Sequence, residues 1–460
     1  SNTSGFQRTA LIATGGKIKY KDGTIELDQI CLEEDSCRHG KNKDEYLLDR
    51  LGIPLLEITT KPQLKTPKQV QNAARALGRL LRSCRVKRGL GTIRQDVNVS
   101  IDGGERVELK GFQDLSTMAK VVENEMERQK NLKSLKGCKV SEISDVTKYI
   151  SKDRGTALAC KLVDWKDNLG TKESPKGHIR MGQELSDYAK KAGVKGLMHS
   201  DELPAYGISS EETKELHKQL KCKKNDAFVL IFGKQDMAKD AMNRVIERAS
   251  INGVPKEVRR VTPESGTRFL RPMPGASRMY PETDIPPMTL SKIDVEIPKT
   301  LDQRETEVPL NSEESKQIVS RNLDAKFYEL IRIYDNPKII SRLLLHTLPS
   351  LESEKNVIIG KEAITQVLNL AKYDKITKEG IENALLQASK GKEIELKNEN
   401  IEAEVREFIS NLINEKIDFV QERGMGAIGP LMGPVMSEFR GKMDGSKINE
   451  LLIKEIKGKI

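Results

Sequence analysis

Two short runs of sequence, residues 92–101 and 106–110, alternate apolar side chains with acidic, basic and amide ones. An alternation with a period of two predicts β-strands with one buried apolar face and one polar face. The intervening residues 102–104 are Asp-Gly-Gly, which is typical of a hairpin turn. The polar face would carry Arg94, Asp96, Asn98, Ser100, Arg106, Glu108 and Lys110.

The same pattern predicts how the two strands pair. A three-residue loop with Gly104 in the left-handed conformation pairs Val99 with Val107 and Val97 with Leu109. Both strands then bury the same face, whereas a two-residue loop would mix polar and apolar side chains on each face. We therefore expect a hairpin with one continuous polar face.

Such a polar face suits the chemistry of a phosphate group and its Mg²⁺ ion. Carboxylate and amide oxygens are hard ligands for the ion, while lysine and arginine neutralise a phosphoryl group in transfer. A second acidic run, Glu33-Glu34-Asp35, ends a predicted strand and would complete such a site. The alternative is a solvated sheet face, which is common in antiparallel sheets.

A helix predicted over residues 67–84 is one of the elements that must position the hairpin. Thr66 suits the N-cap and Pro67 suits the first helical position. The apolar residues recur with the 3.6-residue period of a helix that packs on a core. They are Val70, Ala73, Ala74, Leu77, Leu80, Leu81 and Cys84.

Changes of pattern along the chain predict several domains and a multi-domain α+β fold. We expect an antiparallel-sheet-rich catalytic cradle over residues 1–134, an α/β insertion domain over 135–269 and a return segment of the cradle over 270–304. An all-α helical domain over 305–390 and a tail domain over 391–460 complete the chain.

Composition narrows the class of function. The 78 Lys and Arg residues exceed the 68 Asp and Glu residues, which gives a net charge of +10 and favours polyanions such as RNA. The six cysteines include no Cys-x-x-Cys pair, and no run of about 18 apolar residues occurs. We therefore expect a cytoplasmic protein without disulfides, zinc or a membrane span.

Two phosphate-binding motifs bear on how a nucleotide would be held. A Gly-x-x-x-x-Gly-Lys-Ser/Thr loop is absent, so a nucleotide would not be held by a P-loop. A Gly-x-Gly-x-x-Gly sequence occurs at Gly424, Gly426 and Gly429, but it follows a helical pattern instead of a strand. We interpret it as a tight-turning loop between helices.

Several runs of the chain resemble the GatB/GatE family of tRNA-dependent amidotransferase subunits. They are residues 3–9, 32–35, 51–58, 91–100, 106–110 and 279–287. The insertion, at residues 197–204 and 228–254, is similar to the insertion domain of bacterial-type aspartyl-tRNA synthetases, a combination typical of the archaeal GatE branch. The last residues resemble a YqeY-type tail.

This resemblance implies an ATP- and Mg²⁺-dependent reaction on the glutamate carried by tRNA(Gln). The γ-carboxylate would be phosphorylated, and ammonia would displace the phosphate to give Gln-tRNA(Gln). A GatD-like, asparaginase-type partner would supply the ammonia. We therefore expect a hetero-oligomer that binds this tRNA and neither DNA nor a membrane.

The resemblance also implies roles for individual residues. Glu34 and Glu108 would be Mg²⁺ ligands, with Glu33 as a third. The catalytic residues would be Glu108, Lys110, Arg94 and Asp96, and ATP would contact Asn98, Ser4, Gly5 and Arg106. RNA contacts in the tail would come from Gly424, Gly426, Gly429, Lys442, Lys447 and Lys454.

One departure from the family pattern concerns the start of the chain. The family's opening Gly-Leu-Glu-Ile-His motif, which supplies further metal ligands, does not occur, and the first residues already have the pattern of a folded domain. We therefore expect that natural residues precede Ser1, and that these 460 residues alone bind Mg²⁺ poorly and transfer no amide.

Three alternative functions remain. A bacterial-type GatB protein is disfavoured by the insertion. A non-enzymatic tRNA-binding protein with synthetase-like modules would lack turnover. For an aspartyl-tRNA synthetase, the similarity is confined to the insertion.

Overall fold

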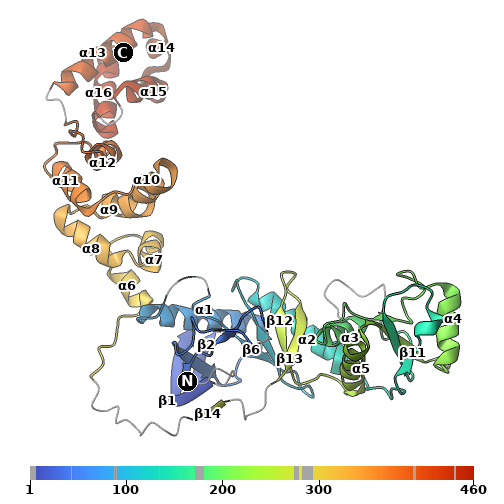
Figure 1. Ribbon diagram of the computed structural model, residues 1–460. Coiled ribbons are helices and arrows are strands. Elements are labelled where there is room, and N and C mark those ends of the chain that lie inside the picture. The colour runs from blue at the N-terminus through green and yellow to red at the C-terminus, as the bar shows by residue number, and fades with distance from the viewer. Residues whose placement is uncertain are drawn as a thin grey trace. The chain divides into compact units, whose positions relative to one another are not determined.

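A computed structural model describes the chain except for residues 1–6, 43, 88, 90, 134, 171–180, 274–278, 282–293, 397–399, 440–441 and 460. The chain forms two compact units, Ser1–Glu296 and Ile297–Ile460, and each is described by itself (Figure 1).

The first unit contains a four-stranded sheet with the order β14-β1-β2-β5. β1 (Gln7–Tyr20) and β5 (Pro54–Thr60) pair antiparallel with β2 (Gly23–Glu34), which lies between them. The short β14 (Met279–Pro281) adds parallel to β1. The expected antiparallel sheet is therefore present, with one parallel edge. A separate two-stranded ribbon pairs β3 (Arg38–His39) with β4 (Tyr46–Leu47).

α1 (Pro67–Ser83) confirms the helix predicted before the hairpin, and Thr66 closes its N-terminus in a capping box. Its buried face is more polar than the apolar period predicted. Gln71 and Asn72 are buried, and each donates side-chain hydrogen bonds to neighbouring segments of the unit. Leu80, in contrast, is 39% exposed. The face that α1 buries is therefore set by these tertiary hydrogen bonds as well as by its apolar residues.

The predicted hairpin belongs to a mixed sheet with the order β13-β12-β7-β6. β6 (Val97–Val99) pairs antiparallel with β7 (Val107–Lys110), and β12 (Glu257–Val261) pairs parallel with β7. β13 (Thr267–Pro272) forms the antiparallel edge. Residues from 257 onward, which the sequence pattern assigned to the insertion, thus share a sheet with the hairpin. The boundary at 269 itself stays a prediction.

Helix α2 (Met118–Lys133) leads from this sheet to the insertion. The insertion contains an antiparallel sheet with the order β10-β11-β9-β8. Its strands are β8 (Ser144–Asp145), β9 (Thr156–Leu162), β10 (Met198–His199) and β11 (Ala227–Gly233). The strand and following helix predicted around Phe228 are confirmed by β11 and by α5 (Gln235–Ser250).

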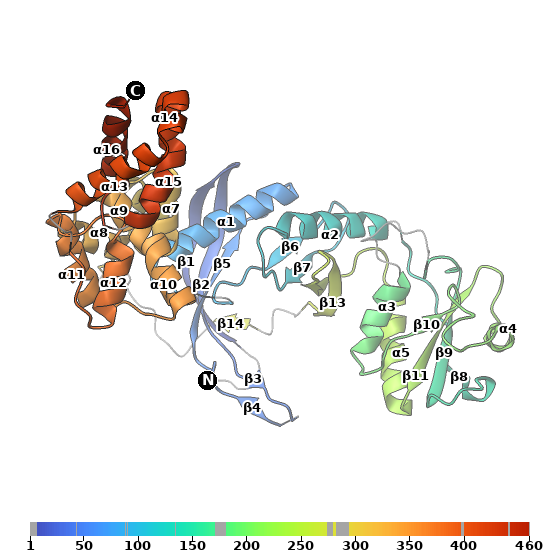
Figure 2. The ribbon, with the colours of Figure 1, turned by 90° about the horizontal axis from the view of Figure 1, so that it is seen from above.

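The insertion's helices lie on both faces of its sheet. α3 (Met181–Lys190) and α5 (Gln235–Ser250) pack against the core that continues to the hairpin sheet. α4 (Ser210–Gln219) and the 3₁₀ turn η1 (Thr147–Tyr149) cover a second, smaller core (Figure 2). The insertion is therefore a sheet between two helical layers.

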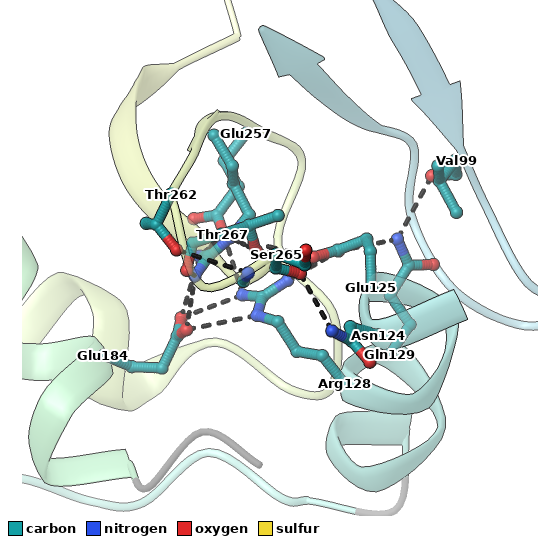
Figure 3. A network of polar contacts seen from close by, with 12 residues as sticks. Val99, Asn124, Glu125, Arg128, Gln129, Glu184, Glu257, Thr262, Ser265 and Thr267 are labelled. Carbon is teal, nitrogen blue, oxygen red and sulfur yellow. Dashed lines mark hydrogen bonds and ion pairs between the residues drawn. The ribbon is translucent and has the colours of Figure 1, made fainter. Parts of the chain in front are cut away.

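A buried ion network ties α3 of the insertion to α2 and to the hairpin sheet (Figure 3). Glu184 of α3 accepts hydrogen bonds from Arg128 of α2 at 2.8 Å and from Arg259 of β12 at 2.8 Å. Arg128 also contacts Glu125 at 2.9 Å and Glu257 at 2.8 Å. Salt bridges buried this deeply are strongly sensitive to the loss of one partner, because the other charge is left unpaired in a dry interior.

The formal charges of this network balance when Arg248 is included. The network then contains three arginines and three glutamates, namely Arg128, Arg248, Arg259, Glu125, Glu184 and Glu257. Arg248 is fully buried with its Nε 3.9 Å from Glu184, and its nitrogens make no hydrogen bond to any described residue. Burial alone would raise the pKa of Glu184, but Arg128 and Arg259 hold that pKa well below its usual range.

The second unit is helical, as predicted for the region after Asn311, and contains two apolar cores. The first core is formed by α6 (Leu301–Glu307), α7 (Ser312–Ser320), α8 (Asp324–Ile333), α9 (Pro337–Arg342), the π-helical turn η4 (Leu343–Thr347), α10 (Leu348–Lys355), α11 (Lys361–Lys372) and α12 (Ile381–Ser389). The second is formed by α13 (Ile401–Glu415), α14 (Ile417–Arg423), the 3₁₀ turn η5 (Gly424–Ala427), α15 (Ile428–Phe439) and α16 (Gly445–Lys457).

All six cysteines are free thiols, as expected from their spacing. Among the helices of the described residues, none combines the length and the apolar character that crossing a membrane requires.

Replacing Glu184 by Gln should destabilise the first unit by about 3–5 kcal/mol, because three buried arginines would then face two carboxylates. Unfolding can be followed by the fluorescence of Trp165, the single tryptophan, which is buried in this unit. Glu123→Gln in α2 is the control, since the ion pair of Glu123 with Lys120 is 62% exposed on both sides and its loss should leave the midpoint unchanged. Equal midpoints for both variants would contradict the role given to the network.

Candidate functional site

The hairpin has the register that the alternation predicted. Val97 pairs with Leu109, and Val99 pairs with Val107. Val99, Val107 and Leu109 are buried in the main core of the first unit. Asn98 lies opposite Glu108 on the other face. The sequence therefore assigned both faces of the hairpin correctly.

The turn of the hairpin differs from the prediction. Gly103, with a φ of 74°, has the left-handed conformation that was expected for Gly104. The N–H of Gly104 donates to the carbonyl oxygen of Ile101 at 3.0 Å. Among turns closed in this way, the type II turn requires a positive φ at its third residue, and here that residue is Gly103. The first strand is also shorter than the alternating run, since it starts only at Val97.

Lys110 organises the polar face of the hairpin. Its Nζ contacts the carboxylate of Asp96 and lies 2.5 Å from Oε1 of Glu108. The side chains of Lys110 and Glu108 are 32% and 19% exposed, so this triad is partly shielded from water. Burial lowers the pKa of Lys110, but hydrogen bonds to the two carboxylates outweigh burial and raise that pKa overall. The lysine is thus held as a cation in a fixed position.

Glu33, from the predicted acidic run at the end of β2, lies near the same lysine. Its side chain is 9% exposed and shares a hydrogen bond with Glu57 of β5. Burial, and then the charge and hydrogen bond of Glu57, raise the pKa of Glu33 to about 7, while Lys110 acts in the opposite direction. The other oxygen of Glu33, Oε1, has no hydrogen-bond partner among the described residues.

Glu57 is the residue that sequence reasoning missed. It lies within the run 51–58 that carried the family resemblance, and the structure places it across from Cys31 on the strand beside Glu33. A single carboxylate inside the otherwise uncharged strand β5 was the available signal. Its pairing with Glu33 depends on the register of β2 with β5, which the sequence alone did not provide.

This arrangement is suited to bind a cation and an anion side by side. Glu33 keeps its proton up to about pH 7 beside the carboxylate of Glu57, and a divalent cation can take the place of that proton, because oxygen atoms are the ligands that Mg²⁺ prefers. The ammonium of Lys110 next to them is suited to the oxygens of a phosphate. The orphaned oxygen of Glu33 is consistent with a ligand that binds at this position.

The predicted set of metal ligands is not assembled as one cluster. Glu34 follows Glu33 in β2, so strand alternation turns it to the other face, toward the turn at Gly52. Within the described ranges, no three acidic, histidine or cysteine side chains converge closely enough to hold a metal ion. Glu33, Glu34 and Glu108 are therefore not brought together, and their roles as ligands stay predictions.

The remaining predicted residues are exposed or lie outside the described residues. Arg94, Asn98 and Arg106 are exposed. The Nη2 of Arg106 lies 3.1 Å from the sulfur of Met273, just after β13. Ser4 and Gly5 lie outside the described residues, so the structure does not address their predicted contact with ATP.

In the second unit, the glycine motif connects helices as predicted, with one difference. Gly424, with a φ of 54°, ends α14, and Gly426 lies in the 3₁₀ turn η5. Gly429 belongs to the first turn of α15 and not to a loop. A side chain at Gly426 or Gly429 would point into open space among the described residues, so the backbone is accessible there.

The three predicted tail lysines are all exposed, but their surroundings differ. Lys442 lies over the ring of Phe439 at 5.7 Å, and Lys454 is in the last turn of α16. Lys447 forms an ion pair with Glu402 at 3.0 Å, so its charge is partly compensated.

Replacing Glu33 by Gln should stabilise the first unit at pH 8 but not at pH 4. The folded carboxyl keeps its proton up to about pH 7, whereas the unfolded one loses it near its ordinary value of 4.5, so wild-type stability falls as pH rises between these values. Glutamine removes this loss, for a relative gain of about 2 kcal/mol at pH 8. Denaturant titrations in chelator-containing buffer measure this gain, and an equal difference at both pH values would contradict the raised pKa of Glu33.

Two family models match the chain. The model described as the GatB/GatE catalytic domain matches residues 1–296, and the one described as GatB domain matches residues 325–456. Together they cover the hairpin, the insertion and most of the helical unit.

Curated relatives align with almost the whole chain. The E subunit of glutamyl-tRNA(Gln) amidotransferase from Thermococcus sibiricus is 39% identical over 507 aligned residues, which cover 99% of this chain and 79% of the relative. The corresponding protein of Archaeoglobus fulgidus is 40% identical over 491 residues, with the same two coverages. That of Methanocaldococcus jannaschii is 39% identical over 504 residues, covering 99% of this chain and 80% of the relative.

Proposed function

The chain belongs to the GatB/GatE family, and from this premise we propose that it is the glutamate-activating subunit of an amidotransferase that converts Glu-tRNA(Gln) to Gln-tRNA(Gln). A carboxylate is a poor electrophile, so its amidation requires activation. ATP would phosphorylate the γ-carboxylate of the tRNA-linked glutamate, and ammonia would then displace phosphate.

The observation that carries this proposal is the position of Lys110 between Asp96 and Glu108 and beside the Glu33–Glu57 pair. Fixed cations and anions at one place stabilise charge that develops during phosphoryl transfer, and they need no reorganisation at that moment. A non-enzymatic tRNA-binding protein would have no use for a buried carboxyl such as Glu33, whose pKa is raised to about 7 beside the carboxylate of Glu57.

Each residue of the site has a proposed role. Glu33 and Glu57 would hold Mg²⁺, which when bound neutralises phosphate oxygens. Lys110 would orient the phosphoryl group, and Asp96 and Glu108 keep Lys110 charged and fixed in place. Arg94, Asn98 and Arg106, which lie along the same hairpin, would contact ATP. Glu34 is a weaker candidate as a ligand, because it faces away from Glu33.

The ammonia would come from a separate amidase. No arrangement in the sequence resembles the nucleophile of an amidase, so a GatD-like, asparaginase-type partner would supply it. The protein would therefore work as part of a hetero-oligomer.

Replacing Lys110 by Met or Glu57 by Gln should lower amide formation at least 100-fold, because the site loses its fixed cation or one of its paired carboxylates. The assay combines the full-length protein, its amidase partner, ATP, Mg²⁺, an amide donor and Glu-tRNA(Gln). Affinity for the tRNA should change less than twofold.

The matched control is Lys61→Met, which removes an exposed lysine of the same unit whose ion pair with Glu26 at 2.9 Å lies toward the opposite end of β2 from Glu33. It should retain full activity. Full turnover of the Lys110→Met variant would exclude the proposed site, and equal loss in the Lys61→Met control would show that the effect is not specific.

The tail is proposed to contact the tRNA at its glycine motif, where the protein backbone is accessible. Replacing Gly429 by Leu should weaken tRNA binding about tenfold without lowering stability, because the new side chain meets open space in the free protein but occupies the proposed RNA surface. Filter binding and thermal unfolding measure the two effects. Gly429→Ala is the control with a minimal side chain, and wild-type affinity in the Leu variant would place the RNA elsewhere.

A further inference from the structure

Lysines from three separate segments of the insertion lie at one end of its sheet, where β9 finishes and β11 begins. The segments are residues 136–139, which lie before β9, residues 161–166 at the C-terminal end of β9, and residues 218–224, which run from the last turn of α4 toward β11. We call their lysines the lysine edge, comprising Lys136, Lys139, Lys161, Lys166, Lys218, Lys221, Lys223 and Lys224. Neither the proposed active site nor the tail includes any of these residues.

Hydrogen bonds of the backbone and of two side chains hold these three segments together. Four hydrogen bonds connect them: Val163 N–H to the carbonyl of Lys139 at 3.0 Å, Lys166 N–H to the carbonyl of Asn225 at 3.0 Å, Trp165 Nε1–H to the carbonyl of Lys136 at 3.1 Å, and Lys161 Nζ to the carbonyl of Lys221 at 3.2 Å. The pairing of Ala227 with Leu162 continues this connection into the sheet. The lysines are therefore concentrated by the fold and not by their order in the sequence.

Most of this positive charge is not neutralised within the protein. Seven of the eight lysines are exposed, and Lys161 is half-buried. Among the described residues, the one carboxylate within ion-pair distance of the lysine edge is Glu215, 4.0 Å from Lys218. Asp226 lies between the segments, but it is buried and accepts hydrogen bonds from the backbone N–H groups of Asp164 and Lys223. Asp164 and Asp167 are also exposed, but their negative charges are far fewer than the positive charges of the eight lysines.

The character of this surface points to a phosphate backbone as its ligand. Stable protein interfaces have an apolar centre, but these three segments, which are fully described, expose no large apolar side chain. Lysine ammonium groups without carboxylate partners are suited to phosphates, whose contacts give affinity and position without reading bases. Like charges held together by the fold also repel each other, and a polyanion relieves that repulsion.

We propose that the lysine edge binds the sugar-phosphate backbone of the tRNA substrate. This inference rests on the proposed function, because the substrate is then an RNA that must stay bound while its glutamate is activated and amidated. It adds a contact surface in the insertion to those expected in the tail.

The test is a triple variant, Lys221→Glu, Lys223→Glu and Lys224→Glu, in the full-length protein. Its affinity for a tRNA(Gln) transcript should fall at least tenfold at moderate salt. The slope of log affinity against log salt should become shallower by about 2, since each lost phosphate contact removes roughly 0.7–0.9 of that slope. A second variant with Ala at the same positions, together with Trp165 fluorescence, verifies that the fold is intact.

The matched control carries the same charge change elsewhere in the insertion, as Lys190→Glu, Lys195→Glu and Lys239→Glu. These exposed lysines belong to the α3 and α5 layer, where Val194 packs near Gly233, at the far end of β11 from the lysine edge. The control should keep nearly wild-type affinity. Equal weakening in both triples would mean general electrostatic attraction and would overturn the assignment.

Two further outcomes separate this inference from its alternatives. Unchanged tRNA affinity, with loss of the amidase partner from the complex, would overturn the proposal in favour of a protein interface. Wild-type protein that binds tRNA through the lysine edge but forms no amide with its partner would refute the proposed function and leave the RNA contact standing.

Discussion

The pairing of buried charges between α2, α3 and β12 is the constraint on which the rest of the first unit depends. Glu257 and Arg259 of β12 pair with Val107 and Leu109 of β7. The network that holds β12 in place therefore also holds β7 in place. Removing a charge from water is costly, and a shift in register would leave a buried charge unpaired. Because Glu184 of α3 belongs to the same network, the insertion and its lysine edge are anchored to the sheet that carries the hairpin.

The opposite face of the same strand carries the candidate chemistry. Lys110 registers with Arg260 and lies between Asp96 and Glu108, while Glu33 and Glu57 approach from a different sheet. The sheet of the hairpin thus supplies the cation of the candidate site, and the sheet of β2 and β5 supplies the pair of carboxylates. Rigid strands suit this task, because phosphoryl transfer depends on charges that are already in position.

The sequence by itself determined the local features. The period of two predicted the faces and register of the hairpin, and Thr66 with Pro67 marked the start of α1, because these depend on residues close together in the chain. The order of the motifs along the chain also identified the family. The local pattern placed the positive φ at Gly104, whereas the structure has it at Gly103, because both glycines suit the turn and composition does not distinguish them.

Only the tertiary structure decided which acidic residues meet. The sequence offered Glu33 and Glu34 as neighbours, but strand alternation and the pairing of β2 with β5 bring Glu33 to Glu57 and turn Glu34 away. The buried network was likewise invisible, because Glu184 and Arg259 are ordinary charged residues until the fold removes them from water. Contacts between residues far apart in the chain follow from packing and register, and a single sequence does not contain these directly.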